Sequence, residues 1–385
     1  MKFDLSLISS TPCYYYDMDL LDHTLQKIKE CTLGRPFKVH YAVKANGEPE
    51  ILRAIANAGL GADCVSGGEI KATLDTGFQT ADICYAGVGK TDEEIEMAIA
   101  NGIGCLNVES VEELEIISEI AERLRRVANV ALRINPNIDA HTHHYITTGL
   151  EENKFGIDMS RVDEAVDIVM ASKWLHLQGL HFHIGSQITI AEPFALLCKR
   201  VNALTAKLAK RGVNVETINV GGGLGIDYDN PDANPIPDFK GFFDTIYEGL
   251  TLSPGQEIHC ELGRSIVGQC GSLVSKVLYV KKGVDRNFAI IDAGMNDLIR
   301  PALYQAFHRI DVLDDNGNAL ADNGNDQLYD VVGPVCESAD VFAVGVSLPT
   351  IKRGTILAIR SAGAYGAAMA STYNMRPIAN PVFAK

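Results

Sequence analysis

Membrane-spanning and secretory segments are missing from this sequence. No apolar run in the 385 residues approaches the length that crosses a bilayer, and residues 1–10 lack the basic start and long apolar centre of a signal peptide. Short repeats and low-complexity linkers are also missing, which argues against a solenoid or loosely tethered modules. We therefore expect a globular protein of the cytoplasm that has no membrane partner.

Disulfide and redox motifs are equally scarce. The chain has nine cysteines, an odd number, and no C-x-x-C pair. Several of them, including Cys64, Cys84 and Cys105, fall inside predicted strands, where a reduced thiol behaves as a small apolar side chain. We expect the cysteines to be reduced.

Basic residues are fewer than acidic residues in this sequence. The 34 lysines and arginines are outnumbered by 49 aspartates and glutamates, which gives a formal net charge of -15. This balance argues against nucleic acid or an anionic membrane surface as a partner, although it identifies no substrate.

Strand and helix patterns alternate evenly from residue 39 to residue 260. A chain of this length is larger than one ordinary hydrophobic core holds. Eight strand–helix units in series are typical of a (β/α)8 TIM-like barrel. The alternative, a doubly wound sheet, would need a crossover switch that the even alternation does not suggest. The predicted strands are 39–43, 62–65, 83–86, 104–108, 130–134, 178–184, 217–220 and 257–260. The predicted helices between them are 48–58, 68–76, 91–101, 111–128, 161–170, 195–211 and 239–250.

After residue 261 the rhythm stops. Apolar and polar residues alternate over 272–280, 287–291, 327–332, 341–346 and 355–359, and glycine, aspartate and asparagine separate these runs. The sequence therefore predicts a barrel over residues 26–260 and a mainly β domain over 261–385. We expect an N-terminal strand within residues 1–25 to join the second domain.

The predicted barrel strands end on polar residues. Catalytic groups of such barrels come from these carboxyl ends, so the side chains that follow each strand are the candidates for a site. They are Lys44 after the first strand, Asp63 in the second, Arg133 in the fifth, His183 and Ser186 after the sixth, Gly222 and Gly223 after the seventh, and Glu261, Gly263 and Arg264 after the eighth.

This set of residues fits one cofactor, pyridoxal 5′-phosphate (PLP). The triple glycine exposes backbone N–H groups where these barrels habitually bind phosphate, and Ser186 and Arg264 can add a hydrogen bond and a charge. Opposite them, Lys44 would meet the other end of the ligand, His183 could lie flat on its ring, and Glu261 could pair with a ring nitrogen. A lysine, a carboxylate for the pyridinium nitrogen and a phosphate cup are what PLP requires.

Several motifs, spread over nearly the whole chain, resemble those of a known family. They are TPCYYYD, YAVKAN, HFHIGSQ, NVGGGLG, ELGRSI, GPVCESAD and AGAYG. Through them the chain resembles the fold-type III, alanine-racemase-like PLP enzymes, and among these the diaminopimelate decarboxylases. Two departures are visible, Leu262 in place of the usual proline and Val43 in place of the common leucine, and neither removes a reacting group.

The resemblance implies roles for the cofactor residues. Lys44 of YAVKAN is implied to bind PLP covalently, and His183 to stack on its ring. Glu261 is implied to hydrogen-bond the pyridine nitrogen, which favours a carbanion-forming reaction such as decarboxylation over racemisation. Gly222 and Gly223, with Ser186 and Tyr365, are implied to hold the phosphate. The strand-end residues Asp63, Arg133, Gly263 and Arg264 complete the expected cofactor-binding set.

The resemblance also implies the substrate contacts, which come from the β domain. Arg300 and Tyr304, beside Arg264 and Tyr365, are expected to bind the far end of the substrate. Glu337 is implied to contact the distal amine and Cys336 to donate a proton, both from the other subunit of a homodimer with shared active sites.

The expected reaction is decarboxylation of meso-2,6-diaminopimelate to L-lysine and CO2. Two alternatives stay open: a decarboxylase of ornithine, arginine or carboxynorspermidine, and a non-catalytic PLP-binding barrel. His141, His143 and His144 are spaced like metal ligands, but no carboxylate or cysteine is fixed near them, and HTHHYITTG resembles a family loop at the substrate entrance. We predict no metal.

Overall fold

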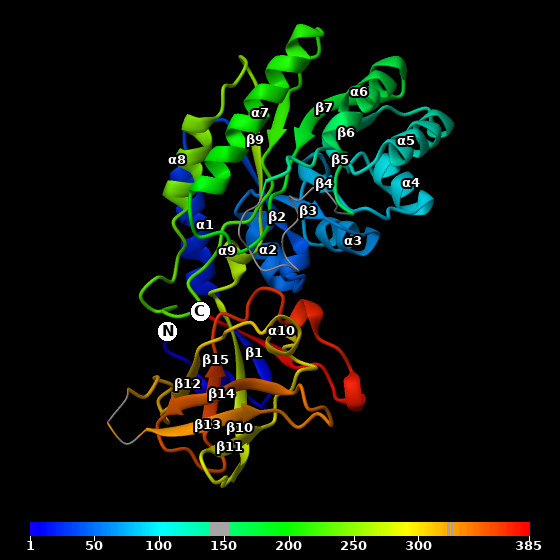
Figure 1. Ribbon diagram of the computed structural model, residues 1–385. Helices are drawn as coiled ribbons and strands as arrows, with labels where there is room; N and C mark the ends of the chain where they lie inside the picture. The colour runs from blue at the N-terminus through cyan, green and yellow to red at the C-terminus, as the bar shows by residue number, and fades with distance from the viewer. Residues whose placement is uncertain (139–153, 322–323, 325) are drawn as a thin grey trace. The chain divides into compact units, whose positions relative to one another are not determined.

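A computed structural model describes residues 1–138, 154–321, 324 and 326–385. The chain divides into two compact units (Figure 1). The barrel unit comprises Leu25–Gly225 and Asp238–Gly263, and the β unit comprises Met1–Thr24, Ile226–Pro237 and Arg264–Lys385. No helix in the described ranges combines the length and the apolar character needed to cross a bilayer.

Parallel strands close the barrel unit in the order of the sequence, β2 to β9, which confirms the predicted fold. Each predicted strand is present with its ends moved by a few residues. The strands are β2 Phe37–Ala42, β3 Gly61–Cys64, β4 Ile83–Tyr85, β5 Cys105–Val108, β6 Ala128–Arg133, β7 Leu175–His181, β8 Thr217–Asn219 and β9 Glu257–Leu262. The register closes through β9, where Phe37 pairs with Ile258 and Tyr41 with Leu262.

The helices of the barrel unit begin at side-chain caps that the sequence supplies. Ser66 caps the helix α3, Ser110 caps α5, and Thr91 forms a reciprocal capping box with Glu94 at the start of α4. Each cap follows a strand end, so it sets where the chain turns back along the barrel. The helices are α2 Pro49–Asn57, α3 Gly67–Asp75, α4 Asp92–Asn101, α5 Val111–Leu124, α6 Val162–Ala171, α7 Glu192–Lys210 and α8 Phe239–Gly249.

The β unit is built on one long strand, β10 Gly271–Lys281, which pairs with β1, β11 and β15. Its sheet follows the order β12-β15-β10-β11-β13-β14, and β1 also pairs with β16. The other strands are β1 Cys13–Asp17, β11 Asn287–Ile291, β12 Ile310–Leu313, β13 Gln327–Val332, β14 Val341–Leu348, β15 Ile356–Ile359 and β16 Asn380–Ala384. Short helices α9 Arg264–Val267 and α10 Arg300–Tyr304 belong to this unit, and α1 Met18–Thr32 crosses the division between the units.

Three details differ from the sequence-based expectation. Strand β2 ends at Ala42, one residue earlier than expected, and Lys44 lies in the single 3-10 turn Val43–Ala45 that follows it. Strands β12 and β16 were not expected, because they are short and β16 contains Pro381. Ile226–Pro237 groups with the β unit, although it lies inside the range 26–260 expected for the barrel.

Candidate active site

A pocket of about 380 Å³ lies within the barrel unit. Its lining contains five residues that the sequence singled out, together with others from the loops that follow the strands. The lining residues are Lys44, Asp63, Val65, Ala86, Gly87, Val88, Gly89, Lys90, Arg133, Phe155, His181, His183 and Glu261.

Two lysines line the pocket, and their environments differ. The side chain of Lys44 is 42% exposed, and its Nζ lies 3.9 Å from Asp63 Oδ2. The side chain of Lys90 is 0% exposed, and its Nζ donates to the carbonyl oxygens of Gly87 and Asn107 and to Glu113 Oε1. All three protons of the Lys90 ammonium are therefore used, so Lys44 is the accessible amine of the pocket.

Asp63 is a buried carboxylate whose oxygens accept no hydrogen bond from the described residues. Burial raises the pKa of Asp63 well above its usual range, and the negative charge of Glu261 raises it further. A buried acceptor of this kind is costly unless a donor reaches it. Lys44, or a protonated nitrogen attached to it, is the donor that the geometry offers.

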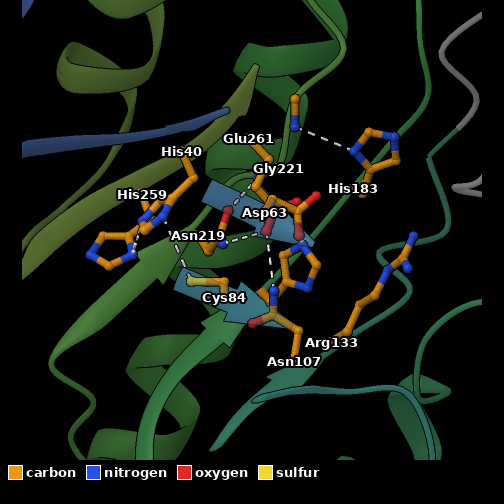
Figure 2. Close-up of polar contacts among 12 residues, drawn as sticks. His40, Asp63, Cys84, Asn107, Arg133, His183, Asn219, Gly221, His259 and Glu261 are labelled. Carbon is orange, nitrogen blue, oxygen red and sulfur yellow. Dashed lines mark hydrogen bonds and ion pairs between the residues drawn. The ribbon is translucent and has the colours of Figure 1, made fainter. Parts of the chain in front are cut away.

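Glu261, at the end of β9, has the opposite environment. Its Oε1 accepts from Asn107 Nδ2 at 3.1 Å and from Asn219 Nδ2 at 2.7 Å (Figure 2). Its Oε2 contacts His181 Nε2 at 3.0 Å. Burial alone would raise the pKa of Glu261, but the contact with His181 and the charge of Lys44 hold it below its usual range. The pKa values of the two carboxyl groups of the pocket are thus shifted in opposite directions. The environment of Asp63 favours the acid, and that of Glu261 favours the anion.

His183 follows β7 and is half-buried. Burial, with the charges of Lys44 and Arg133, lowers the pKa of His183 well below its usual range, so the ring is neutral. The Gly222 N–H donates to His183 Nδ1 at 3.3 Å, and this contact places the ring proton on Nε2. A neutral imidazole held at one edge can lie flat against an aromatic ligand.

The glycine loop after β8 approaches its neighbours more closely than another residue could. A Cβ on Gly222 would lie 1.9 Å from the carbonyl oxygen of Glu261, and a Cβ on Gly221 (φ +71) would lie 2.3 Å from that of Phe182. Gly263 likewise lets the end of β9 pack against Ala42 and Ala45, which flank Lys44. Ser186 is half-buried in the loop after β7.

Arg133 ends β6 and is held in place from two sides. Its Nη1 donates to Glu109 Oε1 at 2.6 Å, and its guanidinium lies 4.8 Å from the centre of the Phe155 ring. Glu109 also accepts from the backbone N–H groups of Gly87 and Gly156. Arg133 therefore lines the pocket with its charge already paired by Glu109. The sequence did not reveal this partner.

These residues fit PLP on observations of this chain alone. Lys44 is an accessible amine beside a carboxylate that lacks a donor, and Glu261 is a buried anion suited to a protonated ring nitrogen. The glycine loop carries no side chains at Gly221, Gly222 and Gly223, so a phosphate could approach its backbone closely.

The β unit places two of the predicted substrate residues on one tyrosine. Arg264 Nη1 and Arg300 Nη1 each donate to the Tyr228 hydroxyl at 2.6 Å. Burial would raise the pKa of Tyr228, but the two guanidinium groups lower it below its usual value. The Arg264 guanidinium also lies 4.9 Å from the centre of the Tyr365 ring. Two buried cations that share a phenol oxygen form a site suited to an anion.

The remaining predicted substrate residues lie elsewhere in the β unit or at its surface. Tyr304 is the last residue of α10 and is half-buried. Cys336 is exposed, and its N–H donates to Asn374 Oδ1 at 2.8 Å. Glu337 is exposed and accepts from the Tyr373 hydroxyl at 3.5 Å.

One cluster of metal-ligand residue types occurs among the described residues, inside the barrel: His40, Cys84 and His259. His40 Nδ1 donates to the Asp82 carbonyl oxygen at 3.1 Å, so His40 Nε2 accepts from His259 Nδ1, also at 3.1 Å. Burial lowers the pKa of His40 to about 3 and that of His259 to about 4. The pair is thus a neutral hydrogen-bonded chain, and the absence of a metal stays a prediction. His141, His143 and His144 lie outside the described residues.

Three important residues were missed from the sequence: Asn107, His181 and Asn219, which surround Glu261. Strand alternation could have found one of them. His181 lies two residues before the selected His183, so the alternation of the strand places both on one face.

Comparisons with known proteins agree with this geometry. Residues 20–268 match the family model described as pyridoxal-dependent decarboxylase, pyridoxal binding domain. Among curated relatives, the diaminopimelate decarboxylase of Bacteroides thetaiotaomicron is 54% identical over 369 residues, which cover 96% of this chain and 94% of that protein. That of Helicobacter pylori (strain J99) is 43% identical over 368 residues, covering 95% and 88%. Among solved structures, diaminopimelate decarboxylase from Helicobacter pylori complexed with L-lysine has a TM-score of 0.92 at 40% identity and covers 99% of this chain and 93% of that chain.

Proposed function

The chain belongs to the diaminopimelate decarboxylases, a family of pyridoxal-dependent decarboxylases, and on this premise we propose that it converts meso-2,6-diaminopimelate to L-lysine and CO2. In this reaction the bond between the α-carbon and its carboxylate breaks, CO2 leaves, and a proton is added to the α-carbon. PLP, when bound, supplies the electron sink that accepts the bond's electron pair.

The observation that most supports decarboxylation is the state of Glu261. Its three contacts hold it as a buried anion, which keeps a ring nitrogen beside it protonated. A protonated ring accepts electrons more strongly than a neutral one, and this favours loss of CO2. A racemase that pairs the same nitrogen with a cation would lack this effect.

We assign roles to the other barrel residues from their environments. Lys44 would bind the cofactor covalently, and Asp63 would accept a hydrogen bond from the Lys44 nitrogen. The neutral His183 would lie against the ring. Gly222, Gly223 and Ser186 would hold the phosphate, and Arg133, Gly263, Arg264 and Tyr365 would complete the site.

Specificity for a second carboxylate would come from Arg264 and Arg300. Both guanidinium groups are buried, and the acceptor they share is a phenol oxygen. A carboxylate could bind to a guanidinium fork in the planar, two-point geometry that arginine favours. An amino acid with a bare terminal ammonium, such as ornithine, would meet two cations here, so this pair favours diaminopimelate over the alternatives.

The assembly is part of the proposal. We infer a homodimer in which Cys336 and Glu337 of one subunit complete the site of the other, Cys336 as the proton donor to the α-carbon and Glu337 as the partner of the distal amine. The exposure of both side chains in the single chain supports this inference. We also propose that the protein acts in the cytoplasm.

The test is CO2 release by the PLP-loaded protein from a panel of diaminopimelate, ornithine, arginine and carboxynorspermidine. Diaminopimelate should be turned over fastest, with lysine as the product. Preference for another amino acid would indicate the decarboxylase specific for that amino acid. Release of no CO2 from any of the four would favour a non-catalytic PLP-binding barrel.

A further inference from the structure

The interior of the barrel is polar at the level of Glu261. Barrels of this type are usually filled there by branched apolar side chains. Here β5, β7, β8 and β9 contribute Asn107, His181, Asn219 and Glu261, all buried. Burying four polar groups is costly unless they bond to one another, so their contacts indicate what the layer does.

The contacts leave Glu261 with little spare capacity. A carboxylate has about four acceptor positions, two on each oxygen. Asn107 and Asn219 occupy both positions on Oε1 (Figure 2). His181 occupies one position on Oε2. One position on Oε2 therefore remains for a donor from a ligand.

Asn219 is fixed at both ends of its side chain. The Gly221 N–H, which can only donate, is 2.9 Å from Asn219 Oδ1. The amide nitrogen must then be the atom that faces Glu261 Oε1 at 2.7 Å. Asn219 thus connects the carboxylate to the first glycine of the glycine loop, that is, the ring-nitrogen end of the cofactor site to its phosphate end.

We propose that Asn219, assisted by Asn107, is a positioning residue that holds Glu261 as an anion. In this arrangement one acceptor position on Oε2 is directed to the N–H of the cofactor ring. Asn219 also links this carboxylate to the glycine loop. The inference rests on the proposed use of PLP. Amide donors suit the task because they stabilise the anion and have no proton to give it.

Other charged and titratable groups also act on Glu261 or respond to its charge. They are His40 on β2, Lys44 in the following turn, Asp63 on β3, Cys84 on β4, Cys105 on β5, His181 on β7, His183 after it, and His259 and Cys260 on β9. A test must therefore change the amide contact and leave these groups in place.

Asn219→Asp meets this requirement. The variant keeps an oxygen for the Gly221 N–H, but it replaces the donor to Glu261 by a second carboxylate. Asn107→Asp makes the same change without touching the glycine loop. Asn129→Asp is the matched control, because Asn129 lies on β6 of the same barrel and donates only to the Gly104 carbonyl oxygen.

The measurement is the 15N resonance of ring-labelled PLP bound to each protein, followed against pH, together with the pH profile of kcat. In the wild type and in Asn129→Asp the ring nitrogen should stay protonated across neutral pH. In Asn219→Asp and Asn107→Asp the new carboxyl group and Glu261 would share one proton, so Glu261 is no longer a full anion. The ring nitrogen should then lose its proton at least one pH unit lower, and kcat should fall at least tenfold. Only Asn219→Ala, which also loses the loop contact, should weaken PLP binding tenfold or more.

A ring-nitrogen titration in both aspartate variants that coincides with the wild type would overturn the proposal. Should Asn219→Asp fail to fold, Asn107→Asp alone decides, because it has the same predicted titration. A wild type that protonates the ring nitrogen but releases no CO2 from diaminopimelate would contradict the proposed function and still support this inference.

Discussion

Lys44 Nζ lies 3.9 Å from Asp63 Oδ2, and Asp63 accepts no hydrogen bond from the described residues. The pocket therefore pairs its accessible amine with its one carboxylate that lacks a donor. Lys90, which lines the same pocket, already donates to three oxygens. This contrast decides which lysine can react and leads to the first two predictions.

Lys44 should bind PLP covalently. Borohydride reduction of the loaded protein followed by peptide mapping should place the pyridoxyl group on the peptide that contains Lys44. Lys44→Ala should abolish the label, whereas the buried Lys90 should never be labelled. A label on Lys90, or none in the wild type, would contradict the assignment.

Asp63→Asn should stabilise the cofactor-free protein at neutral pH. Burial raises the folded-state pKa of Asp63 above its unfolded value of about 3.9, so the folded wild type binds the proton more tightly. Its free energy of unfolding should then fall by up to about 1.4 kcal/mol per pH unit as pH rises from that value toward the folded-state pKa. Below pH 3.9 the two proteins should be equally stable.

Denaturant unfolding at a series of pH values checks this, with Asp75→Asn, at the exposed end of α3, as the control that should show no such divergence. Curves for wild type and Asp63→Asn that stay parallel at every pH would show that Asp63 is not the protonated group. With PLP bound, the same substitution should lower activity, since the donor on Lys44 would keep an amide oxygen as acceptor but lose the negative charge of its partner.

Gly222→Ala should weaken PLP binding. The added Cβ would lie 1.9 Å from the Glu261 carbonyl oxygen, so the loop must move, at a cost of about 1–3 kcal/mol. The apparent Kd, measured by fluorescence titration with PLP, should rise about tenfold. Gly68→Ala is the control, because its Cβ would find only an ordinary contact with Ser66 Oγ at 3.7 Å. Equal affinities for both variants would show that the loop does not hold the phosphate.

Arg300→Ala should impair turnover of diaminopimelate much more than turnover of ornithine. Loss of a buried, charge-assisted partner of the distal carboxylate typically costs about 2–5 kcal/mol in binding free energy. This loss should appear in kcat/KM. Arg353→Ala, which removes an exposed arginine bonded to the Leu278 carbonyl oxygen, is the control. Equal losses on both substrates would mean that Arg300 supports the fold or the cofactor and does not recognise the second carboxylate.

Lys44→Ala and Cys336→Ala chains should each be inactive and should regain activity when mixed. If the site is shared across a dimer, a hybrid contains one site with both intact residues, so up to about half of its sites are competent. Activity against mixing ratio, with subunit exchange followed by a fluorescent label, is the measurement. A mixture that exchanges subunits and stays inactive would disprove the shared site.

The sequence alone was sufficient for the order of the barrel strands and for naming the residues that we propose for the site. Local physics explains this success, because strand alternation, helix periodicity and caps such as Ser66 and Ser110 are properties of neighbouring residues. In a parallel barrel every strand end lies at one rim, so Lys44, His183 and Glu261 could be grouped without coordinates. Short strands such as β12 were not predicted, because their run of alternating residues is too short to distinguish from a loop.

The tertiary structure decided which side chains meet across the barrel. Asn107 and Glu261 are 154 residues apart, His181 and Glu261 are 80 apart, and Asn219 and Glu261 are 42 apart, yet all converge on one carboxylate. Their meeting depends on the register in which the strands close, and a shift of one residue would turn these side chains out of the barrel. Arg264 in α9 and Arg300 in α10 also meet on Tyr228 only through the folding of the β unit, although none of the three lies on a strand. Sequence thus determined the kinds of groups available at the site, and strand register determined the charge that each of them holds.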